Sequence, residues 1–399
     1  MTASVTCFLH IPKTAGGSFL ATLCNLFGDR KVLRLTGTWE RARAMIRCAE
    51  DTSWQGIRCI TGHVPRHYFD WTKDGLLPFT VLRDPVQRVF SLYRFMLAQP
   101  EVERERLDMP PGCSFEEFIG AQHPELYSQI NNGICRLLCG DSELSNPDST
   151  LFWQSNDSSG TLHAAISFLQ NCAFGLADCM SHTNMMLESA LRLPFVLDQR
   201  RENTTVDLGF ERDENLIRRV REMNRIDIKL YSWAQHEFAR RVTLIQSGAD
   251  NILASLKASP IEFLRPGIGE ICIADAPARQ GFHEFEPEAD LAWIVAGPAA
   301  RIYLLSESAA NSRIAFRVHC LMDDYPVAQV NILFNGQWFR PNAVRCGPRD
   351  YLLAIDELPF EVGLNILSIH QGITFPVVDV YPGSPDKRRL GIAVRSIVC

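Results

Sequence analysis

The spacing of hydrophobic and polar positions changes once along the chain. Up to about residue 250, short apolar runs alternate with stretches that have the 3.6-residue period of amphipathic helices. This alternation predicts a parallel sheet with helices on both faces. The predicted strands are 5–9, 32–35, 56–61, 78–82 and 174–176, and the predicted helices are 19–27, 39–50, 86–97, 115–119, 162–169, 183–192 and 211–241, with a polar loop at 142–160.

After about residue 250 the helical period fades and short strand patterns replace it. Asn335-Gly336 lies between two such patterns and predicts a type I′ hairpin turn. Many short strands at this spacing predict an antiparallel β-sandwich or jelly roll. The predicted strands are 271–274, 291–295, 301–305, 314–321, 328–334, 351–355, 365–370 and 391–398. We therefore predict two domains, an α/β domain at 1–250 and an all-β domain at 262–399.

The segment HIPKTAGGS, residues 10–18, joins the first predicted strand to the first predicted helix. Backbone N–H groups and the helix dipole at such a junction favour an anion, and Lys13 adds a mobile cation. A Walker P-loop needs a lysine after its last glycine, whereas Lys13 precedes both glycines here, so the segment is not that of an NTPase. The predicted donors to the anion are Lys13, Thr14, Ala15, Gly16, Gly17 and Ser18.

The segment RDPVQRVFSLY, residues 83–93, follows another predicted strand. Arg83 offers bidentate geometry to a phosphate, and Ser91 on the following helix is a second candidate ligand. Asp84 and Arg88, four residues apart, are predicted to form a structural ion pair. For Arg94 and Arg136, contact with acceptor or cofactor and exposure to solvent stay equally open. Two anion-binding segments suggest one ligand with two separated phosphate-type groups.

A histidine lies between these two segments, in Gly62-His63-Val64. Imidazole titrates near neutrality, so His63 is the candidate general base. We expect His10 to orient the first loop, and His67 is a weaker candidate for contact with an acceptor. Lys13, His63 and Arg83 each follow a predicted strand, and ligands of parallel sheets bind at the carboxyl ends of strands. One shared site is therefore expected.

The three segments in this order resemble the family of heparan sulfate and uronyl 2-O-sulfotransferases and their bacterial relatives. The resemblance covers residues 5–242, with weaker matches at 132–140 and 224–238. It implies a P-loop-like α/β fold and transfer of a sulfuryl group from 3′-phosphoadenosine 5′-phosphosulfate to a carbohydrate hydroxyl, which leaves 3′,5′-ADP. It assigns the 5′-phosphosulfate to Lys13 and its loop, the 3′-phosphate to Arg83 and Ser91, and the catalytic base to His63. The segment 386–392 is similar to the terminal strand of β-sandwich modules on bacterial enzymes of surface-polysaccharide synthesis.

Composition and charge narrow the remaining classes. A net charge of −6 disfavours bulk binding to nucleic acid, and no zinc-type ligand spacing or GxSxG elbow occurs. The 13 cysteines are scattered singly, and we find neither a leader pattern nor a membrane-spanning run. We therefore expect free thiols and a cytoplasmic enzyme that needs no metal.

Two other functions stay open at this point. One is a non-catalytic scaffold that binds nucleotide or glycan, and the other is a sulfotransferase for a small molecule or a protein tyrosine. The acceptor, its regiochemistry, the oligomeric state and the role of the β domain are not determined by the sequence.

Overall fold

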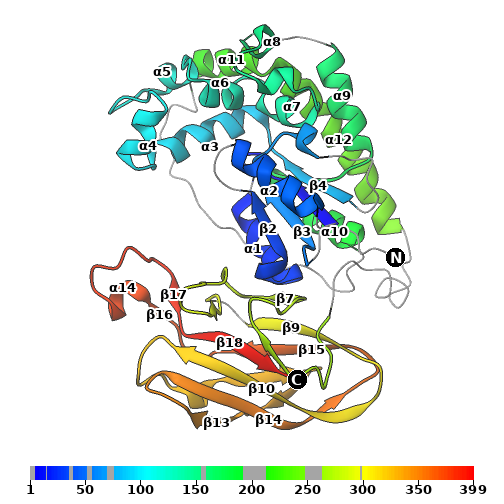
Figure 1. Ribbon diagram of the computed structural model, residues 1–399, viewed down its shortest axis with the longest axis vertical. Coiled ribbons are helices and arrows are strands. Elements are labelled where there is room, and N and C mark those ends of the chain that lie inside the picture. The colour runs from blue at the N-terminus through cyan, green and yellow to red at the C-terminus, as the bar shows by residue number, and fades with distance from the viewer. Residues whose placement is uncertain are drawn as a thin grey trace. The chain divides into compact units, whose positions relative to one another are not determined.

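The computed structural model (Figure 1) describes residues 5–14, 16–35, 39–51, 56–69, 76–153, 159–191, 213–247, 263–296 and 299–399. These residues form two compact units. The first takes its residues from Met1–Ser18, Arg34–Gln55 and Ile60–Asn251, and the second from Phe19–Leu33, Gly56–Cys59 and Ile252–Cys399. The domain boundary expected at 250–262 falls outside the described residues.

The first unit contains most of a five-stranded sheet with the order β2-β3-β1-β4-β5. Its strands are β1 (Val5–Leu9), β2 (Val32–Leu35), β3 (Cys59–Gly62), β4 (Leu76–Leu82) and β5 (Ala173–Leu176). Strand β4 pairs in parallel with β1 and with β5, and all five residues of β1 are buried. The predicted α/β sheet is confirmed.

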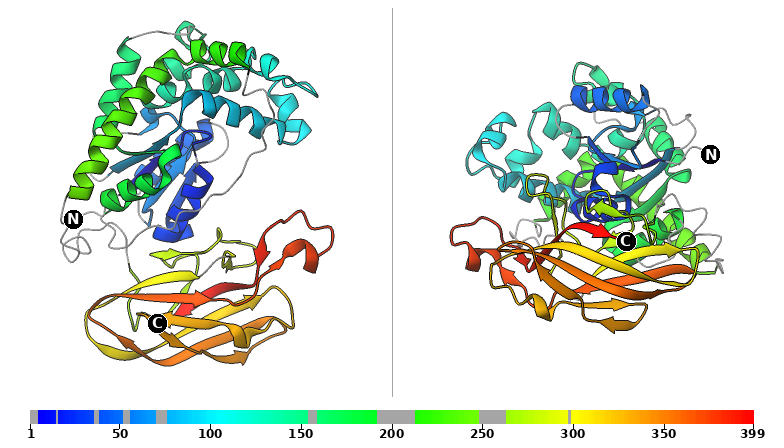
Figure 2. Two further views of the ribbon diagram at one scale, coloured as in Figure 1. Left: turned by 180° about the vertical axis from the view of Figure 1, so that it is seen from behind. Right: turned by 60° about the horizontal axis from the view of Figure 1, so that its bottom comes forward.

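Helices lie on both faces of this sheet. Helix α2 (Trp39–Asp51) lies on one face, and α10 (Met180–Leu191) and α12 (Arg225–Ser247) lie on the other (Figures 1 and 2). The other helices that begin in this unit are α1 (Gly16–Phe27), α3 (Pro85–Leu97), α4 (Glu101–Arg106), α5 (Phe115–Ile119), α6 (Pro124–Ile130), α7 (Gly133–Leu138), α8 (Thr150–Trp153), α9 (Ser159–Gln170) and α11 (Glu214–Met223).

Two predictions for this unit need correction. The helix predicted over 211–241 is interrupted at Asn224, which caps the end of α11 before α12 begins. The loop predicted at 142–160 contains α8 and a 3₁₀ turn at Glu143–Ser145. By contrast, Ser114 and Glu117 form the reciprocal capping box that explains the start of α5.

The C-terminal part of the second unit is the predicted β-sandwich. One sheet has the order β13-β14-β10-β18-β6, with β8 also paired to β18, and the other has the order β12-β11-β15-β9-β7. The long strands are β9 (Ala300–Ser306), β10 (Ala310–Cys320), β14 (Asp350–Phe360), β15 (Gly363–His370) and β18 (Ile392–Val398). The short elements are β6 (Glu270–Cys272), β7 (Arg279–Gln280), β8 (Ala292–Trp293), β11 (Asn331–Phe334), β12 (Gln337–Phe339), β13 (Asn342–Arg345), β16 (Phe375–Pro376), α14 (Val377–Val380) and β17 (Arg389–Leu390).

The hairpin between β11 and β12 confirms the predicted turn. Phe334 pairs with Gln337, and the two intervening residues, Asn335 and Gly336, have φ angles of 47° and 85°. Both angles are positive, as a type I′ turn requires. Inside the sandwich, side chains from both sheets, including Phe316 and Phe334, form one buried apolar core.

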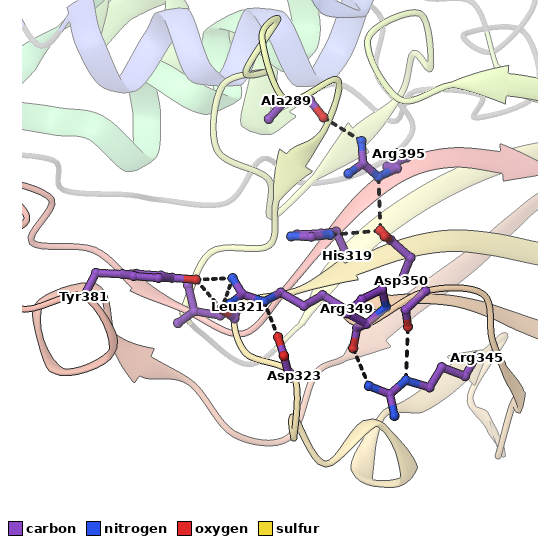
Figure 3. Close-up of polar contacts among 11 residues, drawn as sticks. Ala289, His319, Leu321, Asp323, Arg345, Arg349, Asp350, Tyr381 and Arg395 are labelled. Carbon is purple, nitrogen blue, oxygen red and sulfur yellow. Dashed lines mark hydrogen bonds and ion pairs between the residues drawn. The ribbon is translucent and has the colours of Figure 1, made fainter.

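A polar network ties three elements of the sandwich together (Figure 3). Arg395 of β18 donates to the Ala289 carbonyl at 2.6 Å and lies 3.4 Å from Asp350 at the start of β14. His319 of β10 lies 2.9 Å from the same carboxylate. Burial alone would raise the pKa of Asp350, but its contacts with His319 and Arg395 outweigh burial and hold the pKa below its usual value.

The second unit also contains an early segment of the chain, residues 19–33. Arg279 is fully buried and pairs with Asp29, which is itself buried. Asn25 accepts from Arg279 at 3.3 Å and donates to the Phe282 carbonyl at 3.1 Å. A buried arginine of the β-rich segment is therefore compensated by a carboxylate some 250 positions earlier.

All 13 cysteines are free thiols. Burial raises the pKa of several of them, including Cys7 and Cys172. No helix in the described part of the chain is long and apolar enough to cross a membrane.

Candidate functional site

Three predicted residues follow three neighbouring strands at the centre of the sheet. Lys13 follows β1, Arg83 follows β4, and His63 follows β3, which borders β1 on its other side. The chain leaves β1 toward the β2 and β3 side of the sheet and leaves β4 toward β5. This reversal between β1 and β4 is where open α/β sheets bind their ligands.

The turn after β1 has an unusual backbone at Lys13. Its φ is 68°, in the left-handed region that non-glycine residues rarely adopt. The hydroxyl of Thr14, which is fully buried, donates to the Ile11 carbonyl at 2.8 Å and closes the turn. Helix α1 begins at Gly16, so Gly16, Gly17 and Ser18 form its first turn, while Ala15 lies outside the described residues. The expected junction of turn and helix start is confirmed.

The two segments that are predicted to bind anions are in contact. Arg83 donates through Nη1 to the Lys13 carbonyl at 3.2 Å, and the Lys13 ammonium lies 4.1 Å from the ring centroid of Phe95 on α3. Burial lowers the pKa of Lys13, and the charge of Arg83 lowers it further. Ser91 lies one turn before Phe95 on the same side of α3 and is buried.

His63 is oriented by the strand end beside it. Its Nδ1 lies 2.7 Å from the His10 carbonyl oxygen, and the two imidazole rings lie 4.0 Å apart. A carbonyl only accepts, so Nδ1 carries the proton in the neutral ring and Nε2 keeps its lone pair. We expected His10 to orient the first loop. The contact that the structure shows is with His63 instead: the carbonyl of His10 fixes the tautomer of the candidate base.

Both histidines are held neutral near physiological pH. Burial, with help from His63 and Lys13, lowers the pKa of His10 to about 3. The side chain of His63 is exposed to solvent on one side, yet the protein atoms around its ring withdraw it from water enough to lower its pKa; the hydrogen bond to His10 opposes this effect, and the charge of Lys13 adds to it. A neutral imidazole with a free Nε2 is the form that accepts a proton.

Gly62 is explained by packing against the neighbouring strand. A Cβ added at this position would lie 2.5 Å from the Cβ of Leu35 and 2.8 Å from its carbonyl oxygen. Any larger residue would therefore push β3 away from β2 just before the candidate base. His67, in the 3₁₀ turn Arg66–Tyr68, is half-buried and edge-on to Tyr68, and among the described residues no contact joins it to Lys13, His63 or Arg83.

The predicted ion pair between Asp84 and Arg88 is wrong. Asp84 instead caps α3, accepting from the Gln87 N–H at 2.9 Å. Arg88 is fully buried and donates to the Gln129 carbonyl, and its Nε and Nη1 have no hydrogen-bond partner. Burial lowers the pKa of Arg88, and the negative charge of the buried Asp227 carboxylate opposes that decrease. The spacing of four residues places both side chains near one another on α3, but Asp84 caps the start of its own helix and Arg88 binds a carbonyl of another segment.

Residues of the two segments with weaker sequence matches, 132–140 and 224–238, hold α7 and α12 together by hydrogen bonds. Asp227 of α12 accepts from the N–H groups of Ile134 and Cys135 at 2.9 and 2.8 Å, at the start of α7. In return, Asn132 accepts from the N–H groups of Ile226 and Asp227 at 3.0 and 3.2 Å. Each helix start is thus capped by a side chain of the other helix.

Arg136 proves to be a structural residue. It is buried and donates to the carbonyls of Asn131, Leu144 and Phe152 at 2.7, 2.8 and 2.7 Å. Neither alternative left open for it, contact with a ligand or exposure to solvent, is correct. The site residue that sequence reasoning missed is Phe95, for which only its position one turn beyond Ser91 gave a signal.

This structure defines an α/β protein with a parallel sheet, in which a strand–turn–helix junction and the cation of Lys13 lie at the end of a central strand. A family model described as the sulfotransferase family matches residues 4–234, and the chain belongs to that family. This confirms the resemblance found in the sequence motifs.

Several curated relatives are heparan-sulfate 6-O-sulfotransferases, whereas the motifs resembled the 2-O enzymes. The chain is 26% identical to heparan-sulfate 6-O-sulfotransferase 1 of Homo sapiens over 275 residues, which covers 59% of this chain and 66% of that protein. It is 27% identical to heparan-sulfate 6-O-sulfotransferase 2 of Danio rerio over 279 residues, covering 59% and 58%. Among solved structures, a match to a β-glucosidase from Paenibacillus barengoltzii covers 61% of this chain and 21% of that protein, at 12% sequence identity. Its TM-score of 0.16 is too low to indicate a shared fold.

Proposed function

We propose that the protein transfers a sulfuryl group from 3′-phosphoadenosine 5′-phosphosulfate to a hydroxyl of a carbohydrate. The observation that carries the proposal is the contact of His63 with the His10 carbonyl beside Lys13, at the ends of adjacent strands. Membership of the sulfotransferase family supports the reaction class, and the names of the relatives support a carbohydrate acceptor.

In the proposed reaction the acceptor oxygen attacks sulfur in line with the bond that breaks. A new O–S bond forms, and the bond between sulfur and the bridging phosphate oxygen breaks. The acceptor proton passes to Nε2 of His63, and 3′,5′-ADP leaves with the electron pair on its 5′-phosphate. Alignment, proton removal and stabilisation of the leaving charge are the contributions required of the protein.

The residues divide this work by their chemistry. Lys13 would neutralise the bridging oxygen, and the N–H groups of the first turn of α1 would hold the 5′-phosphosulfate. Arg83 and Ser91 would hold the 3′-phosphate, since both follow β4 on the loop and helix beside that turn. His63 would be the general base. Metal chemistry is not invoked for any of these steps.

The acceptor and location belong to the same proposal. A carbohydrate of a bacterial polysaccharide, its precursor or a glycolipid fits the motif resemblance, and the 13 free thiols fit a reducing cytoplasm. Incubation of the purified full-length protein with labelled donor and a panel of carbohydrates, desulfated heparan sulfate among them, tests the activity. Calorimetric titration with 3′,5′-ADP tests the donor site. Absence of both transfer and binding would refute the proposal.

A first prediction concerns the base. His63→Ala should lower turnover by about 10²- to 10⁴-fold, the usual value of general-base catalysis, and should leave the Kd for 3′,5′-ADP nearly unchanged. His236→Ala is the matched control, because His236 is exposed on α12 and its hydrogen-bond partner among the described residues is the Ser232 carbonyl in its own helix. Full activity in His63→Ala would remove the base assignment.

A further inference from the structure

The contact between Lys13 and Phe95 is the one feature of the site that the proposed chemistry leaves unexplained. Phe95 is 44% exposed, although its helix buries Ser91, Leu92, Tyr93 and Met96 around it. Its ring face lies 4.1 Å from the Lys13 ammonium, well inside the range of a cation–π interaction. An apolar ring is therefore kept at the surface, against a cation that the reaction needs.

The electrostatic setting of Lys13 explains why a ring suits this place. Arg83 is held against the Lys13 carbonyl, so two cations share the turn. Within the described residues no carboxylate forms an ion pair with Lys13. A carboxylate would stabilise the ammonium, but it would also repel an incoming phosphosulfate. The face of an aromatic ring attracts a cation without carrying net negative charge.

We propose that Phe95 is a positioning residue for Lys13. The ring of Phe95 binds the ammonium when the donor is absent, and the ammonium moves from the ring to the anionic donor when the donor binds. The proposal rests on the proposed function for the identity of that donor. The contact with the ring and the carbonyl contact from Arg83 together fix both ends of the lysine, its backbone and its amine. The ammonium is thus kept over Phe95 on α3, one turn from Ser91, which is a candidate ligand for the donor.

The test measures the amine of Lys13 itself. A short pulse of acetic anhydride at several pH values, followed by mass spectrometry, gives the acylation rate of each lysine. In Phe95→Leu the side-chain volume is kept but the ring face is lost, so the ammonium is less stable. Lys13 should then be acylated about two- to five-fold faster near neutral pH. In Phe95→Tyr, which keeps the ring face, the rate should stay near that of the wild type.

Internal references separate this effect from unfolding. Lys387, exposed in the β-sandwich, should be acylated at one rate in all variants, and Val102→Ala, at an exposed position of α4, should leave Lys13 unchanged. A second measurement uses the wild type alone: after reductive methylation with ¹³C, the methyl signals of Lys13 should be shifted upfield by the ring. Equal acylation rates in Phe95→Leu and Phe95→Tyr, or an unshifted signal, would overturn the proposal.

A parallel measurement tests the proposed function separately. Saturating 3′,5′-ADP should slow acylation of Lys13 in the wild type, because the ammonium then faces phosphate. Failure of this protection would count against the donor site, whereas the comparison of leucine with tyrosine at position 95 decides the role of the ring.

Discussion

At the residue scale, a backbone carbonyl decides which nitrogen of His63 is available. The His10 carbonyl oxygen lies 2.7 Å from Nδ1, so Nδ1 carries the proton of the neutral ring. Nε2 therefore keeps a lone pair that can accept a proton. The ring of His10 lies against the ring of His63 and stacks on Phe8, and its low pKa keeps it uncharged. The tautomer of the candidate base is therefore set by a backbone carbonyl.

This arrangement predicts the pH dependence of turnover. The pKa of His63 lies below 6.5, its ordinary value, and the base works only when neutral. Activity should rise as pH increases through a midpoint below 6.5 and should be flat from there to neutral pH. Measurement of kcat/KM for sulfuryl transfer from pH 4.5 to 8 in a constant-ionic-strength buffer checks this. A midpoint above 6.5 would contradict the assignment.

The positive φ of Lys13 predicts a difference between two variants. Both Lys13→Ala and Lys13→Gly remove the ammonium and should lose turnover. Alanine retains the strain of a left-handed backbone, about 1–2 kcal/mol, whereas glycine is free of it but gains chain entropy when unfolded, worth roughly 0.5–1 kcal/mol. The free energy of unfolding should therefore be about 0.5–1 kcal/mol higher for Lys13→Gly than for Lys13→Ala. Urea titration followed by circular dichroism measures it, and a more stable alanine variant would show that the turn is unstrained.

Local sequence was enough to find the residues that follow strands, but not those whose partners are remote. Lys13, His63 and Arg83 were placed correctly at strand ends because each motif carries its own strand and turn signal. Arg88 and Arg136 were misread, since their partners lie on other segments that no local period reveals. The roles of the site residues in binding and catalysis stay predictions.

At the element scale, the exchange of caps between α7 and α12 fixes the helices behind α3. Asp227 caps α7, Asn132 caps α12, and Arg88 of α3 is buried near this pair of caps. Burial raises the pKa of Asp227, and the charge of Arg88 and the N–H donors act against that increase. Helix α3, which carries Ser91 and Phe95, is thus anchored through a buried cation.

A double-mutant cycle tests this anchoring. Arg88→Met and Asp227→Asn each leave one buried charge without its counter-charge, so each should lower the free energy of unfolding by about 3–5 kcal/mol. The double variant should lose at least about 1 kcal/mol less than the sum, since no charge is left unmatched. Urea unfolding measures all four proteins. Strict additivity would show that the two charges do not interact.

Element type was predicted well wherever an apolar pattern was long. The central strands, α3 and the hairpin at Asn335 were found within a few residues. The strands missed, among them β7, β12, β13 and β17, have only two to four residues, too few to show alternation. The break at Asn224 was missed because its amide serves tertiary bonds to Ile130 and Asn132.

At the scale of the whole molecule, the second unit is not continuous in sequence. Residues 19–33 belong to it, and Arg279, Ala274 and Ala278 bond to Asp29, Arg30 and Leu26. The family match ends at residue 234, which suggests that a chain cut near that residue would fold. The structure argues against this, because residues 19–33 belong to the second unit.

We predict that a chain ending at residue 250 is much less stable than the full-length protein. Truncation removes the residues that contact Asp29, Arg30 and Leu26, and it exposes to solvent the surface of residues 19–33 that those residues cover. In the 399-residue chain, Arg279→Met isolates one part of this loss: it removes the buried cation that pairs with Asp29 and should cost about 3–5 kcal/mol. Urea midpoints and 3′,5′-ADP titration compare the three proteins. A truncated chain with the full-length midpoint and affinity would disprove the prediction.

The pairing of Asp29 with Arg279 also has a consequence for synthesis on the ribosome. The two residues are 250 positions apart, and translation at about 5–20 residues per second separates their emergence by roughly 10–50 s. Throughout that interval Asp29, in the 3₁₀ turn after α1, lacks the arginine with which it pairs in the folded protein. The second unit therefore cannot be completed until the C-terminal third has been synthesised, and a nascent chain that stops before Arg279 presents residues 19–33 without these partners.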